Sequence, residues 1–495
     1  MLNLSSFIRF HAARSPQRIA VAFNDQRITY AEFSHRIERT AGYLSAQGIR
    51  PDDVVAVMMK NSAAFLELAF AVSHLGAVFL PINFRLAADE VEYIVGNARA
   101  KLVLADAEFA AAVANVPATI LLDDAAQADT TVISGEHPPA FMHVRNAHDL
   151  FRLMYTSGTT DRPKGVMHSY DNFYWKSMDH VIALGLNRDD RLLVTGPLYH
   201  VGAFDLPGIA VLWVGGMLCI HREFDVQRVL RSVAAERLTG AWLAPVMLGS
   251  ILSHPNRAAF DVSSLRWIIG GGERTPEARI RQFSEYFTHG RYIDAYGLTE
   301  SCSGDSFMEA GREIEKIGSV GRALAHIEIE IRDAQGARLP ASEAGEICLR
   351  GPKITRGYWL DEKKTAASFH GDWFRTGDVG YLDAEGFLYL TDRVKDMIIS
   401  GGENIASSEV ERVVYQMPQV REAAIIGVPD EKWGERPVAV VVLNTGYSLD
   451  YETLAEHCRA HLAGFKVPKQ LILRGELPRN PSGKVLKRLL RDELQ

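Results

Sequence analysis

The chain has 495 residues, a hydrophobic fraction of 47%, a charged fraction of 23% and a formal net charge of -7. This composition is that of a globular protein, and the length suggests about three domains of ordinary size or one large domain with an appendage. The acidic balance disfavours a broad nucleic-acid surface, and no apolar run approaches the ~20 residues that a membrane helix needs. We therefore expect no nucleic-acid partner and no membrane span.

The N-terminal stretch predicts a first amphipathic helix, because Leu4, Phe7 and Ile8 recur at helical spacing. A transit segment is the weaker alternative, since the stretch lacks a cleavage-like site. The cysteines are far apart and form no Cys-x-x-Cys pair, which disfavours a disulfide framework and a Cys-rich zinc site. A reducing compartment, the cytoplasm, fits this pattern. The four are Cys219, Cys302, Cys348 and Cys458.

Short apolar runs alternate with helical patterns through the first 300 residues. This alternation is typical of parallel sheets covered on both faces, so we predict an α/β architecture. Ligands of such sheets bind beyond the carboxyl ends of the strands. The loops after these runs are therefore the candidate sites. The runs cover residues 54–59, 77–82, 101–106, 191–196, 217–221 and 266–272.

The pattern changes after about residue 318, where strictly alternating segments predict a β-rich subdomain. Another pattern, with helices near 407–416 and 450–462, begins at about residue 393. We expect a large N-terminal domain at 1–392, which includes the β-rich part at about 318–392, and a small α+β C-terminal domain at 393–495. Residues 125–148 are the least regular and predict a surface excursion.

One apolar strand, beginning at Phe151, runs directly into a loop rich in hydroxyl groups. Hydroxyls, a glycine and backbone N–H groups form a concave donor surface for phosphate oxygens, and Lys164 adds a positive charge beside it. The loop is no Walker A motif, because no Gly-Lys-Ser/Thr unit occurs. A plain surface turn is the less favoured alternative. The loop residues are Thr156, Ser157, Gly158, Thr159 and Thr160.

Three further loops after predicted strands contain candidate site residues. One places His200 beside two aromatic residues, the second is Gly270-Gly271-Gly272-Glu273, and the third is Ala295-Tyr296-Gly297-Leu298-Thr299-Glu300. Together with Asp378 in Thr-Gly-Asp and Arg393, they supply an aromatic face, a carboxylate for Mg²⁺ and partners for ribose hydroxyls. This set indicates a nucleoside triphosphate site. The sequence has neither a kinase-like catalytic loop nor a Gly-x-Ser-x-Gly elbow.

These motifs, in this order, resemble the signatures of the adenylate-forming enzymes, which include acyl-CoA synthetases, peptide-synthetase adenylation domains and beetle luciferases. The resemblance covers almost the whole chain and is strongest to the acyl-CoA synthetase branch. It rests on residues 156–165, 296–300, 376–378, 392–395, 400–404 and 481–484.

The resemblance implies a role for individual residues. Thr156 and Glu300 would serve Mg²⁺, Tyr296 would lie against adenine, Asp378 would bind ribose, and Arg393 would contact ribose or phosphate. Lys395 would be the hinge of the small domain, Lys484 would reach the carboxylate and the α-phosphate, and Gly401 and Gly402 would form the CoA-side loop. Lys484, His200 and Glu300 would be the catalytic residues, with His200 between the nucleotide and the acyl pocket. The remaining nucleotide contacts would come from Gly271, Gly272, Glu273, Asp294, Ala295, Gly297 and Thr299, and the acyl pocket from His200, Ala203, Gly270 and Gly304.

The implied activity is that of an ATP-dependent acyl-CoA ligase that forms an acyl-adenylate and then a CoA thioester, with Mg²⁺ as metal. Small residues near the pocket favour a medium-chain, branched or ring-bearing acid. Two alternatives stay open: an adenylation enzyme that loads an acyl carrier protein, and a degenerate nucleotide-binding regulator. The oligomeric state is also open, with a homodimer as one option.

Two residues depart from expectation. Asp161 stands where the family usually has glycine, and a carboxylate there would repel a triphosphate unless it points away or pairs with Arg162. Asp205, which follows the His200 loop, could line a pocket for a partly polar acid, but we favour a helix-capping role.

Overall fold

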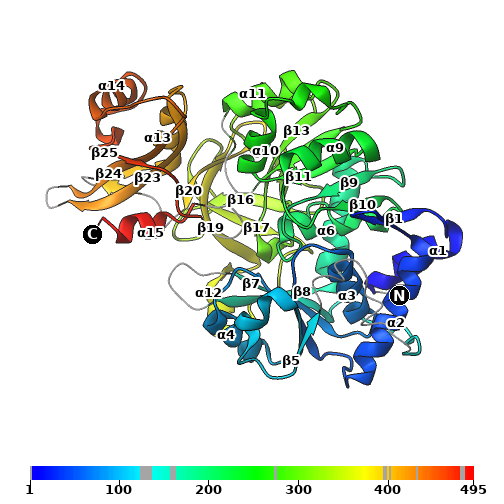
Figure 1. Cartoon of the computed structure of the whole chain (residues 1–495). Coiled ribbons are helices and arrows are strands. Elements are labelled where there is room, and N and C mark those ends of the chain that lie inside the picture. Colours follow the sequence, from blue (N-terminus) through cyan, green and yellow to red (C-terminus); the bar gives the residue numbers. More distant parts are fainter. Residues whose placement is uncertain are drawn as a thin grey trace.

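The computed structural model describes residues 3–122, 137–156, 163–271, 275, 277–393, 398–400, 403–430, 433–479 and 485–494. The strands within these described residues form four sheets, and helices cover the two larger ones (Figure 1). The helices are α1 (Leu4–Arg14), α2 (Tyr30–Ala46), α3 (Ala63–His74), α4 (Ala88–Ala98), α6 (Tyr170–Leu184), α7 (Val201–Phe204), α8 (Ile209–Trp213), α9 (Val226–Glu236), α10 (Pro245–Leu252), α11 (Glu277–Tyr286), α12 (Glu362–Ala367), α13 (Ser407–Val414), α14 (Tyr451–His461) and α15 (Lys487–Asp492), with the 3₁₀ turns η1 (Ala107–Val113), η3 (Arg257–Ala259), η4 (Thr299–Ser301) and η5 (Gly464–Lys466).

The largest sheet has nine strands in the order β15-β14-β13-β12-β11-β9-β10-β1-β2. The neighbours from β13 to β1 run parallel, whereas β2, β14 and β15 are added antiparallel. The strands are β1 (Ile19–Phe23), β2 (Gln26–Thr29), β9 (Arg191–Val194), β10 (Met217–Ile220), β11 (Gly240–Leu243), β12 (Trp267–Gly270), β13 (Arg291–Tyr296), β14 (Ser306–Phe307) and β15 (Arg322–Ala323).

The second sheet has six strands in the order β6-β5-β3-β4-β7-β8. All neighbours are parallel except β7 and β8, which form an antiparallel pair around the hydroxyl-rich loop. The strands are β3 (Val54–Met58), β4 (Val78–Pro81), β5 (Ala100–Asp106), β6 (Thr119–Leu122), β7 (Leu150–Thr156) and β8 (Lys164–Ser169).

Helices and these two sheets alternate in layers. Buried side chains of α9, α10 and α11 pack on one face of the nine-stranded sheet. The main core contains α1, α2, α3, α6 and α8 together with side chains of both sheets, so these helices lie between them. The outer face of the six-stranded sheet is covered by α4 and η1. The central strands β3, β4, β10, β11 and β12 are buried along their whole length because helices cover both faces of each sheet, which is why they read as continuous apolar runs.

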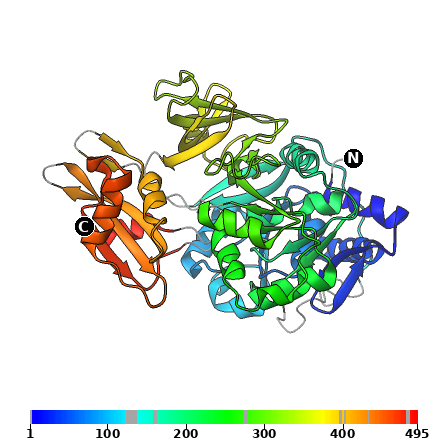
Figure 2. The same ribbon diagram turned by 90° about the horizontal axis from the view of Figure 1, so that it is seen from above.

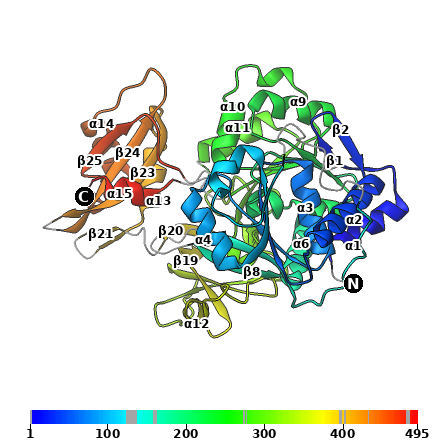
Figure 3. The ribbon, with the colours of Figure 1, turned by 60° about the horizontal axis from the view of Figure 1, so that its bottom comes forward.

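The third sheet is antiparallel and five-stranded, and the strands of the fourth all come from residue 398 onwards. The strands after residue 398 and helices α13–α15 form a separate body, and the third sheet lies beside the large α/β body (Figure 2). Figure 3 shows α12 and the third sheet on the side of the molecule away from α9–α11. The strands are β16 (Glu328–Arg332), β17 (Gly345–Arg350), β18 (Phe369–His370), β19 (Trp373–Leu382) and β20 (Leu388–Arg393), then β21 (Ile398–Ser400), β22 (Glu403–Ile405), β23 (Val420–Asp430), β24 (Gly434–Leu443) and β25 (Gln470–Arg474).

The predicted architecture, parallel α/β sheets with a β-rich part and a separate C-terminal α+β domain, is confirmed. The N-terminal helix buries Leu4, Phe7 and Ile8, as the spacing predicts. All four cysteines are buried and free. Among the described residues, no helix has the length and apolar character to cross a membrane. The expected excursion at 125–148 falls partly on 123–136, which lie outside the described residues.

Candidate active site

Two residues that the sequence assigns to the nucleotide lie in direct contact. Tyr296 ends β13, and its hydroxyl donates to Asp378 Oδ2 on β19 at 2.9 Å. Both side chains are more than nine-tenths buried. Burial, reinforced by the Asp378 charge, raises the pKa of Tyr296 well above its usual value, so this hydroxyl stays protonated and acts as a donor. The large sheet and the third sheet thus meet at a polar contact suited to a nucleoside.

Of the two strands that flank the hydroxyl-rich loop, the sequence predicted the one before it, β7. Thr156 is the last residue of β7 and lies opposite Lys164, the first residue of β8. Residues 157–160 of the predicted cradle, and Asp161, lie outside the described residues. The antiparallel return of the chain in β8 was not predicted, because its sequence has no clear period of two.

The turn that carries Glu300 is held by several polar contacts. Its carboxylate Oε1 accepts from the Tyr358 hydroxyl at 2.9 Å, and its backbone carbonyl accepts from the Thr355 N–H at 2.7 Å. Burial, then the Glu300 charge, raises the pKa of Tyr358, which keeps that hydroxyl a donor. Tyr358 also forms a β-bridge with Val166 of β8. The turn therefore lies beside the strand pair of the hydroxyl-rich loop.

His200 occupies the N-cap position of α7, where its Nδ1 accepts from the Gly202 N–H at 3.0 Å. Burial lowers the pKa of His200 to about 4, so the ring is neutral at pH 7 with its proton on Nε2. Its ring centroid is 6.2 Å from that of Trp242, the last residue but one of β11. A Cβ on Gly202 would lie 2.6 Å from the indole, so glycine is required for this close approach.

The predicted glycines differ in what lies beside them. A Cβ on Gly271 would be 3.3 Å from the Ala295 carbonyl and 3.7 Å from Trp242 Nε1. At Gly270 that space holds the Tyr292 hydroxyl, and at Gly304 it holds the His180 ring, so the protein's own side chains account for both. Contact of Gly270 and Gly304 with an acyl group stays a prediction.

Other predicted residues lie on the same strands or outside the described residues. Asp294, Ala295 and Gly297 flank Tyr296 on β13 and in the following turn, and Ala203 is buried in α7. Arg393 ends β20 directly opposite Asp378 in the strand register. The rest of the predicted set, Gly272, Glu273, Lys395, Gly401, Gly402 and Lys484, lies outside the described residues.

Asp205 is the C-cap residue of α7, where its backbone N–H donates to the Val201 carbonyl, but its side chain does not make the capping contact that we expected. Its carboxylate is fully buried and pairs with Arg152 at 2.8 Å and Lys176 at 3.3 Å. A buried carboxylate needs such partners, and the two cations sit on elements far away in the sequence.

Sequence reasoning missed four residues of this region: Trp242, Tyr358, Arg152 and His168. For Arg152 a signal existed, because a charged residue interrupts the otherwise apolar strand Phe151–Tyr155. Nothing in the sequence marks Tyr358 or Trp242, whose importance follows from tertiary contacts.

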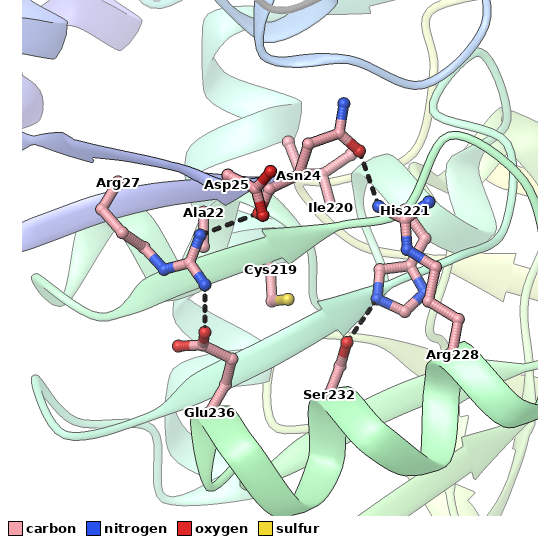
Figure 4. A pocket seen from close by; sticks show the side chains of 10 residues that line it. All are labelled: Ala22, Asn24, Asp25, Arg27, Cys219, Ile220, His221, Arg228, Ser232 and Glu236. Atoms are coloured by element: carbon pink, nitrogen blue, oxygen red, sulfur yellow. Dashed lines mark hydrogen bonds and ion pairs between the residues drawn. The ribbon is translucent and has the colours of Figure 1, made fainter.

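A separate pocket of about 460 Å³ contains none of the predicted site residues (Figure 4). It lies between the β1–β2 turn, β10 and α9, and several of its polar side chains pair with one another. Arg27 pairs with Glu236, Arg228 donates to Asn24 at 2.6 Å, and His221 bonds Ser232 at 2.9 Å. Because the pocket contains none of the predicted site residues, we assign it no role in the reaction.

Comparisons with known proteins identify the class as adenylate-forming enzymes. The AMP-binding enzyme model matches residues 8–359, and the AMP-binding enzyme C-terminal domain model matches residues 409–484. The chain is 38% identical to a feruloyl-CoA synthase of Amycolatopsis sp over 98% of both chains, and 35% identical to the long-chain-fatty-acid–CoA ligase FadD13 of Mycobacterium tuberculosis over 100% of this chain and 99% of that one.

Solved structures agree. The o-succinylbenzoate CoA synthetase of Bacillus subtilis, solved with its acyl-adenylate intermediate, superposes with a TM-score of 0.89 at 32% identity, over 98% of both chains. The same protein has been solved with ATP and a magnesium ion. The chain belongs to the AMP-binding enzyme family, as its ordered motifs predicted.

Proposed function

We propose that this protein is an ATP-dependent acid–CoA ligase that activates a ring-bearing or medium-chain carboxylic acid as its acyl-adenylate and then forms the CoA thioester. The observation that carries the proposal is the convergence of the predicted nucleotide residues. Tyr296 contacts Asp378, and the Glu300 turn lies beside the strands that flank the hydroxyl-rich loop. Relatives of the protein are named as a CoA synthase and a CoA ligase, and these names support the same function.

The chemistry needs cancelled charge. A carboxylate and ATP are both anions, so attack on the α-phosphorus requires fixed alignment and local positive charge. Lys484 would supply that charge at the carboxylate. Thr156 and Glu300 offer a hydroxyl and a carboxylate, the oxygen ligands that Mg²⁺ prefers alongside substrate phosphates. The magnesium would neutralise phosphate charge.

Two half-reactions must then share one site. Pyrophosphate leaves before the thiol enters, and a rotating C-terminal domain would withdraw Lys484 and bring in the loop at Gly401 and Gly402. Lys395, between the third and fourth sheets in the chain, would be the hinge of that rotation.

The class of acid is supported by the surroundings of Trp242. Its indole lies against Gly196 and Gly202, close to Gly271 and the His200 ring, so an aromatic wall stands beside the residues assigned to the acyl group. A flat ring stacks favourably on such a wall. Relatives that act on feruloyl and succinylbenzoyl groups, by their names, are consistent with a ring-bearing acid.

We propose CoA as the acyl acceptor, with an acyl carrier protein as the alternative acceptor. A nucleotide-binding regulator without catalytic activity is the alternative function. Free buried cysteines support a reducing compartment such as the cytoplasm. Light scattering on the purified protein would distinguish a monomer from a homodimer.

The test is pyrophosphate release with Mg-ATP and a panel of aliphatic and aromatic acids, each with and without CoA. Acid-dependent release that turns over only with CoA is the expected result. Pyrophosphate release that stops after one turnover in the presence of CoA, but continues with a carrier protein that becomes acylated, would show that the carrier protein and not CoA is the acceptor. ATP binding without release for any acid would contradict the proposal and favour the regulator.

A further inference from the structure

A fully buried group of charges lies behind the candidate active site. Arg152 on β7, Lys176 on α6 and Asp205 after α7 have at most 1% of their side-chain surface exposed. The guanidinium contacts Asp205 Oδ2 at 2.8 Å, and the Lys176 ammonium lies 3.3 Å from Oδ1 and 3.2 Å from the Asp205 carbonyl. Buried ion pairs stabilise a fold little compared with apolar residues of similar volume. Stability alone therefore gives no reason for this arginine.

Arg152 also fixes the state of a buried histidine. It lies directly opposite His168 in the β7–β8 register, with Nε at 3.1 Å and Nη2 at 2.9 Å from His168 Nδ1. A guanidinium has donors only, so Nδ1 must accept and the ring proton sits on Nε2. Burial, together with the Arg152 charge, lowers the pKa of His168 to about 3, which keeps the ring neutral. Arg152 thus selects one tautomer.

That tautomer points its proton at the candidate site. His168 Nε2 lies 2.6 Å from the Thr299 carbonyl oxygen, which can only accept. Thr299 immediately precedes Glu300, the residue assigned to Mg²⁺. The opposite tautomer would set a lone pair against the carbonyl and repel the turn. The chain Arg152, His168, Thr299 therefore connects the strand before the hydroxyl-rich loop to the turn that carries Glu300.

The Glu300 turn needs such support because its backbone is unusual. Cys302, Ser303 and Gly304 follow one another with φ values of 57°, 71° and 67°. Left-handed backbone is unfavourable for residues other than glycine and persists where the surroundings impose it. The Lys353 ammonium bonds the Gly304 carbonyl and pairs with Asp305 at 2.9 Å, which closes the far side of the turn. His168 holds the near side.

We propose that Arg152 is a positioning residue for adenylate formation: anchored by Asp205, it fixes the His168 tautomer and so holds the Thr299–Glu300 turn where Mg-ATP binds. The inference rests on the proposed function. It predicts that loss of Arg152 or of the His168 donor weakens the magnesium-dependent part of ATP binding and the first half-reaction, and spares the second.

The experiment compares two pairs of variants. His168→Met removes the donor to Thr299 at similar volume, and His168→Gln keeps an N–H donor. Arg152→Met removes the guanidinium and leaves Asp205 paired with Lys176 at 3.3 Å, so that no buried charge loses its only partner, and Arg152→Lys keeps the charge for Asp205 but cannot also bridge to His168. Arg222→Met/Asp106→Asn is the matched control, because that pair is also largely buried, at 3.0 Å, and contacts none of the predicted site residues.

The readouts are the Kd of ATP with and without Mg²⁺ by calorimetry, the rate of acyl-AMP formation, the rate of thioester formation from preformed acyl-AMP, and the melting temperature. Removing an outer-shell partner of a metal ligand costs about 10–100-fold. We expect losses of this size in Mg²⁺-dependent ATP affinity and adenylation for His168→Met and Arg152→Met. Adenylation by His168→Gln should return to within about threefold of the wild type, Arg152→Lys should be intermediate, and thioester formation should change little in all.

Folded variants with unchanged magnesium dependence and adenylation would overturn the proposal. An equal loss in both half-reactions, or the same loss in the Arg222→Met/Asp106→Asn control, would show general loosening and overturn it too. If His168→Met does not fold, His168→Gln and Arg152→Lys decide by the same readouts. The calorimetric readout needs no acid, so failure of the wild type to release pyrophosphate would count against the proposed function while the role of Arg152 in Mg-ATP binding is still decided.

Discussion

The hydroxyl of Tyr296 donates to the carboxylate of Asp378 at 2.9 Å, across 82 positions of sequence. This bond joins the end of a parallel strand of the large sheet to the antiparallel third sheet. Because the carboxylate already accepts one bond from the protein, its orientation is set before a nucleotide arrives. Such preorganisation reduces the ordering cost of binding a ribose.

Asp378 should therefore determine recognition of the ribose hydroxyls. The wild type should discriminate against 2′,3′-dideoxy-ATP, whereas Asp378→Ala should bind ATP and the dideoxy analogue alike. A hydrogen bond to a charged group contributes about 1.5–3 kcal/mol, so the KM for ATP should rise about 10–100-fold in this variant. Tyr296→Phe keeps the ring and the carboxylate, and serves as the milder control. Persistent discrimination in Asp378→Ala would place the ribose elsewhere.

Trp242 should set the size limit of the acid. Trp242→Ala opens the space between Gly196, Gly202 and Gly271, so kcat/KM should shift towards bulkier or longer acids while the KM for ATP stays within about twofold. One methylene in an apolar pocket is worth about 1–3 kcal/mol, which sets the scale of the shift per carbon. Gly202→Ala should have the opposite effect, because its Cβ would press on the indole. An unchanged acid preference in both variants would remove Trp242 from the acyl pocket.

Two sequence patterns predicted this fold: continuous apolar runs, which are typical of buried strands, and the polar or glycine-rich loops that follow them. Apolar runs such as 54–59 and 191–196 predicted the parallel strands β3 and β9. His200, Gly271 and Tyr296 lie at or beyond the carboxyl ends of β9, β12 and β13, where ligands of such sheets are expected. Packing between distant elements was not predictable in the same way. The Trp242 indole matters because glycines at positions 196 and 202 make room for it, and Asp205 was misassigned because its partners lie 53 and 29 positions away.

Buried histidines should make the fold labile to acid. Burial lowers the pKa of His74, His200 and His221 to about 4. Since the unfolded chain takes up these protons first, near pH 6.5, the free energy of unfolding should fall as pH drops from about 6.5 towards 4, by about 1.4 kcal/mol per pH unit for each histidine. Urea denaturation at pH 7 and pH 5 measures this loss.

One histidine can be isolated in that experiment. His74→Gln keeps a polar group beside Ser5 and the Ala140 carbonyl, and should reduce the loss of stability between pH 7 and pH 5. His461→Gln, at an exposed position of α14, should leave the loss as in the wild type. Identical pH dependence in all three proteins would mean that His74 does not couple folding to protonation.

The two lysines assigned by resemblance should separate the half-reactions. Lys484→Ala should slow acyl-AMP formation by about 10²–10³, the usual cost of removing a preorganised group that stabilises charge. Lys395→Pro should leave acyl-AMP formation close to wild type and slow thioester formation, because it stiffens the hinge. Rapid-quench measurement of each step tests both. Equal loss of the two steps in Lys395→Pro would argue against a rotating C-terminal domain.

The proposed reaction begins when the substrate carboxylate attacks the α-phosphorus of ATP. The most direct test supplies a carboxylic acid labelled with ¹⁸O in the carboxylate, together with Mg-ATP and CoA, and analyses the products by mass spectrometry. Attack at the α-phosphorus should give one labelled oxygen in AMP, unlabelled pyrophosphate and a CoA thioester. AMP without label, or ADP with the label in inorganic phosphate, would contradict it.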